Sequence, residues 1–251
     1  MTDSLVIPPR FCGPPGSGNG GYVCGRIAAY VNGPVTVTLR RPPLLATPMA
    51  VERGREGTVR IHHNGTLIAE ATAAPVPPVL ETPGPVSVAE ARTAAGGARY
   101  SQDPAFPNCF VCGMSRQPGD GLRIFPGPVP GRALWAAPWT PDPSVSGPEG
   151  RVRPEVAWAA LDCPSGIAAA ETAGLSQDTA ILLGRMTASL AALPAPSGQC
   201  LVIAWPGGHD GRNLLAGSAL LGPTGEVLAV ATAVWLIVPW PVPALTTEGA
   251  S

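Results

Sequence analysis

The stretch GTLIAEATA at residues 65–73 returns later in the chain as GEVLAVATA at residues 225–233, with five of the nine positions identical. Each copy opens with a glycine turn that leads into a strand. Upstream of each copy, over residues 35–52 and 182–205, the chain runs strand, proline corner, strand, and a helix-like stretch comes before. The sequence therefore predicts two similar halves, each with one helix followed by three antiparallel strands.

The halves differ at their beginnings. The second half has two further predicted strands, near residues 121–127 and 131–139, whereas the first has room only for a short one near residues 4–11. Residues 75–98 are rich in Pro and Ala, carry few large apolar side chains, and are interpreted as a linker. The predicted domains are an N-terminal repeat (1–74), a linker (75–100), a C-terminal repeat (101–243) and a tail (244–251). A helix laid across a long antiparallel sheet, present twice, is an α+β arrangement.

A second pattern suggests a different fold. Gly16, Gly18 and Gly21 match G-x-G-x-x-G, which is found at dinucleotide-binding turns. That fold requires strand–helix alternation in a parallel sheet, and the strand before these glycines would have to contain Pro8 and Pro9. The dinucleotide interpretation is therefore rejected. A phosphate-binding P-loop is excluded because the chain contains no lysine.

The composition argues against several classes of binding partner. A net charge of −1 without any basic run argues against nucleic acid. The longest apolar run, residues 229–245, contains three prolines and is too interrupted for a membrane span. The first ten residues do not have the pattern of a signal peptide, and six irregularly spaced cysteines suit a reducing cytoplasm. We expect a folded cytoplasmic protein.

Short motifs in both halves resemble a known enzyme superfamily. NCFVCG at 108–113, followed by GLRI at 121–124 and AWAALDCPSG at 157–166, resembles hotdog-fold thioesterases of the phenylacetate-degradation type. GNGGYVCG at 18–25 and LRRPPLLATPMAV at 39–51 resemble the helix start and following strands of acyl-CoA thioesterase II. Together these motifs imply a double hotdog, in which two helix-on-sheet repeats form one pseudo-dimer.

The resemblance also implies a site. In hotdog thioesterases the amides at a helix N-terminus face the thioester carbonyl, and a carboxylate from the facing helix acts as base or nucleophile. Unpaired N–H groups and the helix dipole stabilise the oxyanion that forms during hydrolysis. The family motif reads polar-Gly-Gly, with its acid eight residues after the middle position. Eight residues span ~12 Å of one helix, so the site must combine two helices.

Each half keeps a different part of this motif. Residues 19–21 are Asn-Gly-Gly, but Ala28 stands at the acid position of the first half. Residues 153–155 are Arg-Pro-Glu, but Asp162 stands at the acid position of the second half. The first half has kept the glycine amides and lost the acid, and the second half has kept the acid and lost the glycines. We therefore predict one composite site that uses both halves. Its expected catalytic residues are Asp162 as base or nucleophile, the Gly20, Gly21 and Tyr22 amides with Asn19 as oxyanion hole, and Ser165 to orient water.

Three arginines are candidates for contact with the phosphates of CoA. Arg40 and Arg41 end a predicted strand, and Arg185 lies in the corresponding strand of the second half. A solvated strand end is the alternative for each. Trp158 lies four residues before Asp162 and is expected in the core or in an acyl pocket.

The cysteines and histidines are further candidates for functional residues. Cys109 and Cys112 form half of a zinc knuckle, but no second C-x-x-C and no histidine at finger spacing follows. We therefore expect a structural turn there rather than a metal site, with metal binding by Cys109 and Cys112 as the open alternative. His209 and residues 62–63 adjoin Asp-Gly and Asn-Gly hairpin signals and are interpreted as turn residues.

The predicted activity is hydrolysis of an acyl- or aryl-CoA, or carrier-bound, thioester between the two halves. No cofactor is expected, since CoA would be part of the substrate. An acyl carrier protein and a second copy of the chain are the conceivable macromolecular partners. The alternatives are a non-catalytic acyl-CoA or lipid-binding module and a hotdog hydratase or dehydratase. The latter needs a histidine at or near the central helix, where the sequence has none.

Overall fold

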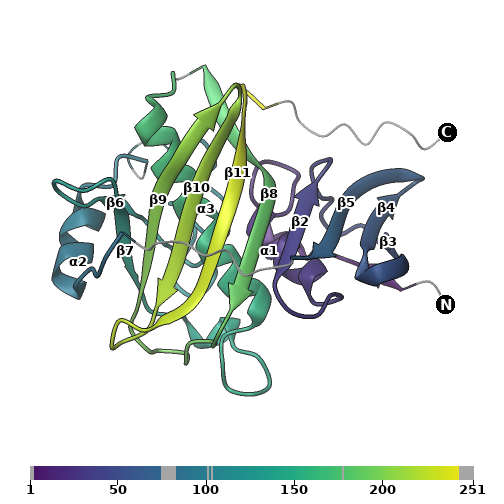
Figure 1. The fold of residues 1–251 in the computed structure, drawn as a ribbon, viewed down its shortest axis with the longest axis horizontal. Helices are drawn as coiled ribbons and strands as arrows, with labels where there is room; N and C mark the ends of the chain where they lie inside the picture. Colours follow the sequence, from purple (N-terminus) through teal and green to yellow (C-terminus); the bar gives the residue numbers. More distant parts are fainter. Residues whose placement is uncertain (1–2, 75–82, 101, 103, 177, 243–251) are drawn as a thin grey trace.

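The computed structural model describes residues 3–74, 83–100, 102, 104–176 and 178–242 (Figure 1). In this part of the chain eleven strands form one antiparallel sheet, in the order β1-β3-β4-β5-β2-β8-β11-β10-β9-β7-β6. The strands are β1 (Ser4–Leu5), β2 (Val35–Leu39), β3 (Met49–Arg53), β4 (Val59–His63), β5 (Thr66–Ala73), β6 (Gly127–Pro128), β7 (Trp135–Trp139), β8 (Thr179–Leu190), β9 (Cys200–Asp210), β10 (Asn213–Leu221) and β11 (Val227–Pro239). The helices are α1 (Gly20–Ala28), α2 (Val88–Gly96) and α3 (Pro154–Ala173), with short 3-10 turns η1 (Pro9–Phe11), η2 (Arg55–Gly57) and η3 (Pro143–Val145).

The elements follow the same order on both sides of the centre of the sheet. Counted outward, the strands are β2, β5, β4, β3, β1 on one side and β8, β11, β10, β9, β7 on the other, with β6 beyond β7. Helix α1 follows β1, and α3 follows β7. Strands β2 and β8 pair antiparallel where the halves meet, and the hydroxyls of Thr36 and Thr187 lie 2.8 Å apart there. This antiparallel sheet is the α+β arrangement predicted from the sequence, and it is incompatible with a dinucleotide fold.

Helices α1 and α3 cover one face of the sheet, which curves around α3 (Figure 1). Helix α3 is rich in alanine, and its middle is buried against strands β7 to β11. Small side chains let the helix approach the sheet closely, and Leu161, Met186 and Val202 fill the core between them.

The glycines of α1 allow close contact with α3. A Cβ added to Gly25 would lie 2.5 Å from the Cα of Glu155, and one added to Gly21 would lie 2.4 Å from the Cβ of Asp162. Real Cβ atoms do not approach other atoms this closely, so only glycine fits at both positions. The glycine-rich helix start therefore serves helix–helix packing and brings α3 against the first turn of α1.

The predicted linker contains a helix. Within residues 75–98, Ser87 caps α2 in a capping box: its hydroxyl accepts from the Glu90 N–H, and the Glu90 carboxylate accepts from the Ser87 N–H at 2.8 Å. The buried residues Ala91 and Ala94 pack on β7. Because the buried face consists of alanines, it lacks the large apolar residues that reveal an amphipathic helix. Residues 75–82 of this stretch, and the predicted tail at 244–251, lie outside the described residues.

Two other predictions about local structure can be compared with the fold. The strand expected at residues 121–127 is absent from the described structure apart from its last residue, in β6. Its backbone instead bonds to the loop before it, with the Leu122 N–H donating to the Phe110 carbonyl at 2.8 Å. The hairpin signal at Asn64–Gly65 is confirmed: both residues have positive φ, and the turn joins β4 to β5.

No helix in the described part of the chain is long and apolar enough to span a lipid bilayer.

Candidate active site

The N-terminus of α1 forms one side of the site. Asn19 is the N-cap, and its side-chain oxygen accepts a hydrogen bond from the Tyr22 N–H at 2.9 Å. An N-cap side chain satisfies one of the amides that have no acceptor inside the helix. The helix starts at Gly20, and α3 starts at Pro154 with Arg153 as its N-cap, so the two helices begin at equivalent points of the family motif.

Asp162 lies on α3 at a break in the helical hydrogen bonding. Pro164 has no N–H, so the helix loses one intrahelical bond there. The hydroxyl of Ser165 donates to the Asp162 carbonyl at 2.7 Å, and the hydroxyl of Ser218 on β10 donates to the Leu161 carbonyl at 2.8 Å. The bond from Ser218 ties this turn of α3 to the sheet, and the bond from Ser165 is made within the helix.

The Asp162 carboxylate meets the start of α1. Its Oδ2 accepts from the Gly21 N–H at 2.9 Å and from the Asn19 Nδ2 at 2.9 Å. Its Oδ1 is buried and has no hydrogen-bond partner among the described residues. The pKa of Asp162 is raised to about 7: burial is the largest cause and the nearby Cys109 adds to it, while the bonds from Gly21 and Asn19 act in the opposite direction. A buried carboxyl group thus lies against the positive end of a helix dipole.

The predicted oxyanion amides differ in what they contact. The Gly21 N–H donates to Asp162, and the Tyr22 N–H donates to Asn19, so both are already engaged. The Gly20 N–H has no acceptor in the part of the chain that the structure describes. Of the three amides, Gly20 is therefore the one available to an oxyanion without breaking an existing bond.

Asp162 and Gly20 line a cavity of about 630 Å³ formed by residues of both halves. A cavity of this size accommodates a cofactor-sized or drug-sized ligand. Its wall is largely apolar, and three arginines belong to it. The lining residues with most bearing on chemistry are Asn19, Gly20, Asp162 and Glu171 (polar), Arg40, Arg41 and Arg99 (cationic), and Ile167, Ile181, Leu183, Trp235 and Trp240 (apolar).

Several predicted site residues do not line this cavity. Ser165 is fully buried, its hydroxyl donates to the Asp162 carbonyl, and it accepts from the indole N–H of Trp235 at 2.9 Å. Both interactions hold the fold, and Ser165 is not positioned to orient water in the cavity. Arg185 donates to the Thr38 hydroxyl at 3.3 Å on the sheet and does not line the cavity. Trp158 is a core residue packed beside Gly25, so it does not form an acyl pocket.

Arg40 and Arg41 line the cavity and are exposed. The Arg40 guanidinium pairs with the Glu70 carboxylate, whereas Arg41 donates to the Arg40 carbonyl at 3.0 Å. Sequence reasoning missed Arg99, which belongs to the same cavity wall and lies in the predicted linker.

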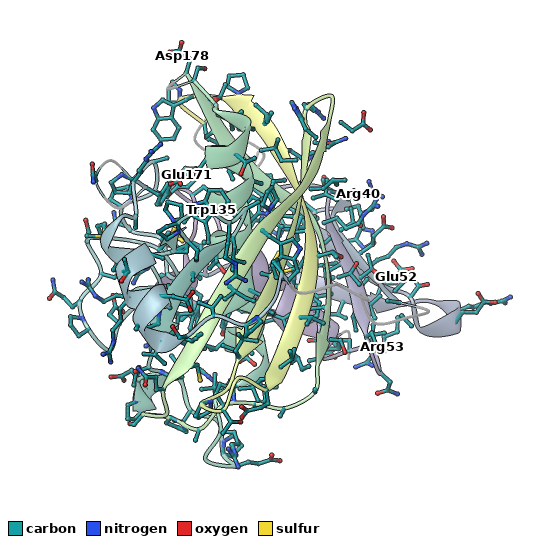
Figure 2. The ribbon with its side chains drawn as sticks, turned by 60° about the vertical axis from the view of Figure 1, so that its left-hand side comes forward. Arg40, Glu52, Arg53, Trp135, Glu171 and Asp178 are labelled. Carbon is teal, nitrogen blue, oxygen red and sulfur yellow. The ribbon has the colours of Figure 1, made fainter. Side chains whose placement is uncertain are left out.

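Glu171 was also missed. It lies on α3 and lines the cavity, and its Oε2 accepts from the indole N–H of Trp135 at 2.8 Å (Figure 2). Its Oε1 is buried without a hydrogen-bond partner among the described residues. The available signal for this residue was an acid within the alanine-rich last turns of α3, residues 168–173.

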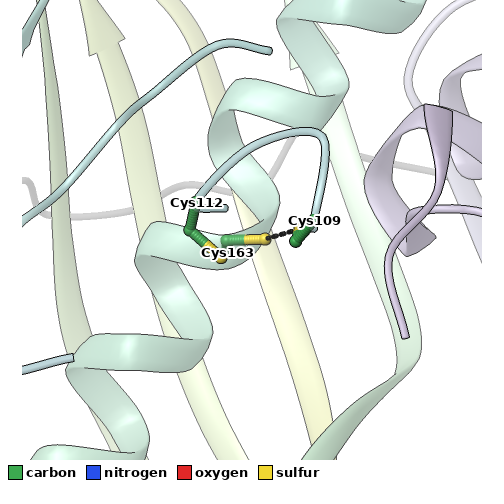
Figure 3. Close-up of side chains that lie close together, drawn as sticks. All are labelled: Cys109, Cys112 and Cys163. Carbon is green, nitrogen blue, oxygen red and sulfur yellow. Dashed lines mark hydrogen bonds between the residues drawn. The ribbon is translucent and has the colours of Figure 1, made fainter. Parts of the chain in front are cut away.

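Three cysteines adjoin Asp162 in the wall of the cavity. The Sγ atoms of Cys109, Cys112 and Cys163 lie within 4.8 Å of one another, and those of Cys109 and Cys163 are 3.6 Å apart (Figure 3). Hydrogen bonds from Cys112 and Cys163 lower the pKa of Cys109. Sequence reasoning considered Cys109 and Cys112 and overlooked Cys163, which directly follows Asp162.

Comparison with solved structures identifies the fold. An acyl-CoA thioesterase II, TesB2, from Mycobacterium marinum superposes with a TM-score of 0.57 at 15% identity, covering 88% of this chain and 89% of its own. A Thermobifida fusca protein proposed to be a thioesterase II gives 0.57 at 16% identity, with 93% and 92% covered. The tesB protein of Mycobacterium avium subspecies paratuberculosis gives 0.53 at 13% identity, with 88% of each chain covered. The chain thus shares the hotdog fold of thioesterase II structures. No protein-family model matches the sequence, and no curated protein sequence does.

Proposed function

We propose that this protein hydrolyses a thioester of CoA or of a phosphopantetheine carrier in the cavity between its halves. The observation that carries the proposal is the Asp162 carboxylate, buried in the cavity wall and held against the first turn of α1. The likeness in fold to acyl-CoA thioesterase II structures supports the same reaction class.

The proposed reaction uses two groups of this chain. Asp162 removes a proton from a water molecule, whose oxygen adds to the thioester carbonyl carbon, or the carboxylate attacks that carbon directly. Negative charge then develops on the carbonyl oxygen, and the Gly20 N–H with the α1 dipole stabilises it. When the carbon–sulfur bond breaks on the water route, the proton held by Asp162 passes to the thiolate. On the direct route the thiolate leaves first, and water then hydrolyses the mixed anhydride on Asp162, which frees the acid and supplies the proton. The products are a carboxylic acid and a free thiol.

Charge and polarity along the cavity support an orientation for the substrate. Arg40, Arg41 and Arg99 form a cationic part of the wall that suits the phosphates of CoA. The apolar side chains Ile167, Leu183 and Trp235 suit the acyl or aryl group. The scissile bond would then lie between these regions, beside Asp162.

We further propose that the two halves are repeats of one hotdog unit that kept one of two symmetric sites. The shared strand order supports this duplication. Position 28, which corresponds to Asp162, is alanine, and the start of α3 carries Pro154 where α1 has glycine. Proline supplies no N–H to an oxyanion, so the second site lacks both of its components.

The test is free-thiol release from a panel of acyl- and aryl-CoA esters. Asp162→Asn keeps the shape of the side chain and removes the base, so we expect kcat to fall by about 10²–10⁴-fold. Glu52→Gln is the matched control. Glu52 lies on β3, next to the edge strand β1 and outside the cavity, so this variant should retain wild-type rates.

Other outcomes identify the rival functions. Binding of acyl-CoA without release from any ester would establish a non-catalytic binding module. Release that survives in Asp162→Asn would keep the reaction class and refute this site. The hydratase alternative is disfavoured because no histidine lines the cavity among the described residues.

A further inference from the structure

The loop at Cys109–Gly113 is a tight turn that carries two of the cysteines. The Cys109 N–H donates to the Phe106 carbonyl at 3.0 Å, and the Gly113 N–H donates to the Cys109 carbonyl at 2.9 Å. A Cβ added to Gly113 would lie 2.4 Å from that carbonyl oxygen, so the turn accepts only glycine there. Two cysteines at C-x-x-C spacing are typical of zinc sites, and this turn brings both thiols to one place in the fold.

The fold supplies a third sulfur from a distant part of the chain. Cys163 on α3 places its Sγ 3.6 Å from that of Cys109, and the Cys112 Sγ lies within 4.8 Å of both (Figure 3). Tetrahedral coordination with Zn–S bonds of ~2.3 Å separates the sulfur atoms by ~3.8 Å. The widest separation, at most 4.8 Å, exceeds this value by no more than about 1 Å, a change of the size that side-chain rotation provides.

Polar groups around the three sulfurs are arranged to support negative charge on them. The Asn19 Nδ2 lies 3.6 Å from the Cys163 Sγ and 3.8 Å from the Cys109 Sγ. Tyr100 lies near the three thiols as well. Polar groups of this kind commonly hold metal-bound ligands in place.

We propose that Cys109, Cys112 and Cys163 bind one Zn²⁺ ion in the wall of the cavity, with its fourth coordination position toward the cavity. Soft thiolates select Zn²⁺ over the hard cations Mg²⁺ and Ca²⁺. Binding releases the protons of the three thiols to solvent and leaves a net charge of −1 on the complex, 4.0 Å from the Asp162 carboxylate at Cys163; the Asn19 amide and the positive end of the α1 dipole face both groups. Three protein ligands with an open position are typical of catalytic zinc sites, whereas structural sites have four.

The site does not depend on the proposed hydrolysis, because a binding module could hold the ion equally well. The experiment therefore measures metal directly. Tag-free protein is stripped with a chelator under a phosphine reductant and then dialysed against Zn²⁺, and bound zinc is counted by atomic emission. We expect one Zn²⁺ per chain. Replacing Zn²⁺ with Co²⁺ should produce the sulfur-to-cobalt charge-transfer band and the visible bands of a tetrahedral site.

Variants test the ligand set. Cys112→Ser should weaken Zn²⁺ binding by at least about 100-fold and abolish the charge-transfer band. Cys200→Ser is the matched control: Cys200 is buried on β9 outside the cluster, and burial raises the pKa of its thiol to about 11, so the variant should bind like wild type.

A measurement on the wild-type protein covers the case in which Cys112→Ser fails to fold. Bound Zn²⁺ should protect Cys109, Cys112 and Cys163 from alkylation, as mapped by mass spectrometry, and leave the labelling of Cys12 unchanged. The proposal is overturned if the reduced protein binds no Zn²⁺, or if zinc leaves the three cysteines as reactive as before. Equal binding by wild type and a folded Cys112→Ser variant would also refute it.

Discussion

Replacing Gly21 by alanine tests the contact on which both the fold and the site depend. The added Cβ would lie 2.4 Å from the Asp162 Cβ, 2.8 Å from the Trp158 carbonyl oxygen and 3.0 Å from the Asp162 Cγ. Two of these neighbours are backbone or first side-chain atoms of α3, which cannot rotate away. The helices must therefore separate, and the 2.9 Å bond from the Gly21 N–H to Asp162 must lengthen or break.

The magnitude follows from three contributions. Overpacking of a well-packed interface costs about 1–3 kcal/mol. Loss of the hydrogen bond to Asp162 adds about 1 kcal/mol. Alanine recovers up to about 1 kcal/mol relative to glycine in a helix. We expect the free energy of unfolding to fall by about 2 kcal/mol, which lowers Tm by about 4–8 °C in a chain of this size.

The assay is thermal and denaturant unfolding together with thiol release. Because the carboxylate would be displaced by a sizeable fraction of an ångström, hydrolysis should fall by about 10²-fold. Gly96→Ala is the matched control, since nothing lies within 4 Å of its added Cβ at the end of α2, and it should leave stability unchanged or raise it. A Gly21→Ala variant as stable and as active as Gly96→Ala would refute both the helix contact and the composite site.

Two further predictions concern the surroundings of the site. Ser165→Ala should lower the free energy of unfolding by about 1–3 kcal/mol, because the buried indole N–H of Trp235 loses its acceptor. If the variant instead loses hydrolysis and keeps its stability, Ser165 orients water as the sequence predicted. Arg41→Gln should raise KM for an acyl-CoA about fivefold, the equivalent of ~1 kcal/mol. An N-acetylcysteamine ester, which has no phosphates, should keep its KM, and Arg60→Gln on β4 is the control. Equal effects on both esters would exclude phosphate contact by Arg41.

Sequence reasoning succeeded where local chemistry decides the structure. The two copies of the nine-residue stretch form β5 and β11, and the glycine that opens each copy has a positive φ, 75° at Gly65 and 86° at Gly225. The starts of α1 and α3 fall where the motif comparison placed them. Turns, caps and strand alternation depend on neighbours within a few residues, so their signals are present in the chain itself.

Sequence reasoning failed where small buried side chains formed a helix, or where a side chain bonded to a partner that the sequence does not indicate. Helix α2 buries only alanines, and its capping box at Ser87 was overlooked. Ser165 has the residue type and position of a water-orienting group, yet its hydroxyl donates to the Asp162 carbonyl and accepts from the Trp235 indole. No pattern in the sequence reveals which atoms a hydroxyl will contact after folding.

By itself, then, the sequence determined most of the elements and their antiparallel arrangement, and the family resemblance placed Asp162 and the start of α1 in one predicted site. Tertiary structure decided which atoms meet there, and it added α2, Glu171 and Cys163. Asp162 bonds to an amide 141 residues away, and Cys163 lies beside a cysteine 54 residues away. The packing of α1 on α3 over a shared sheet brings these residues together. This packing depends on the burial of apolar surface and on glycines that let the helices approach. No local pattern encodes such a fit, so only the folded chain shows a carboxylate, a free amide and three thiols around one cavity.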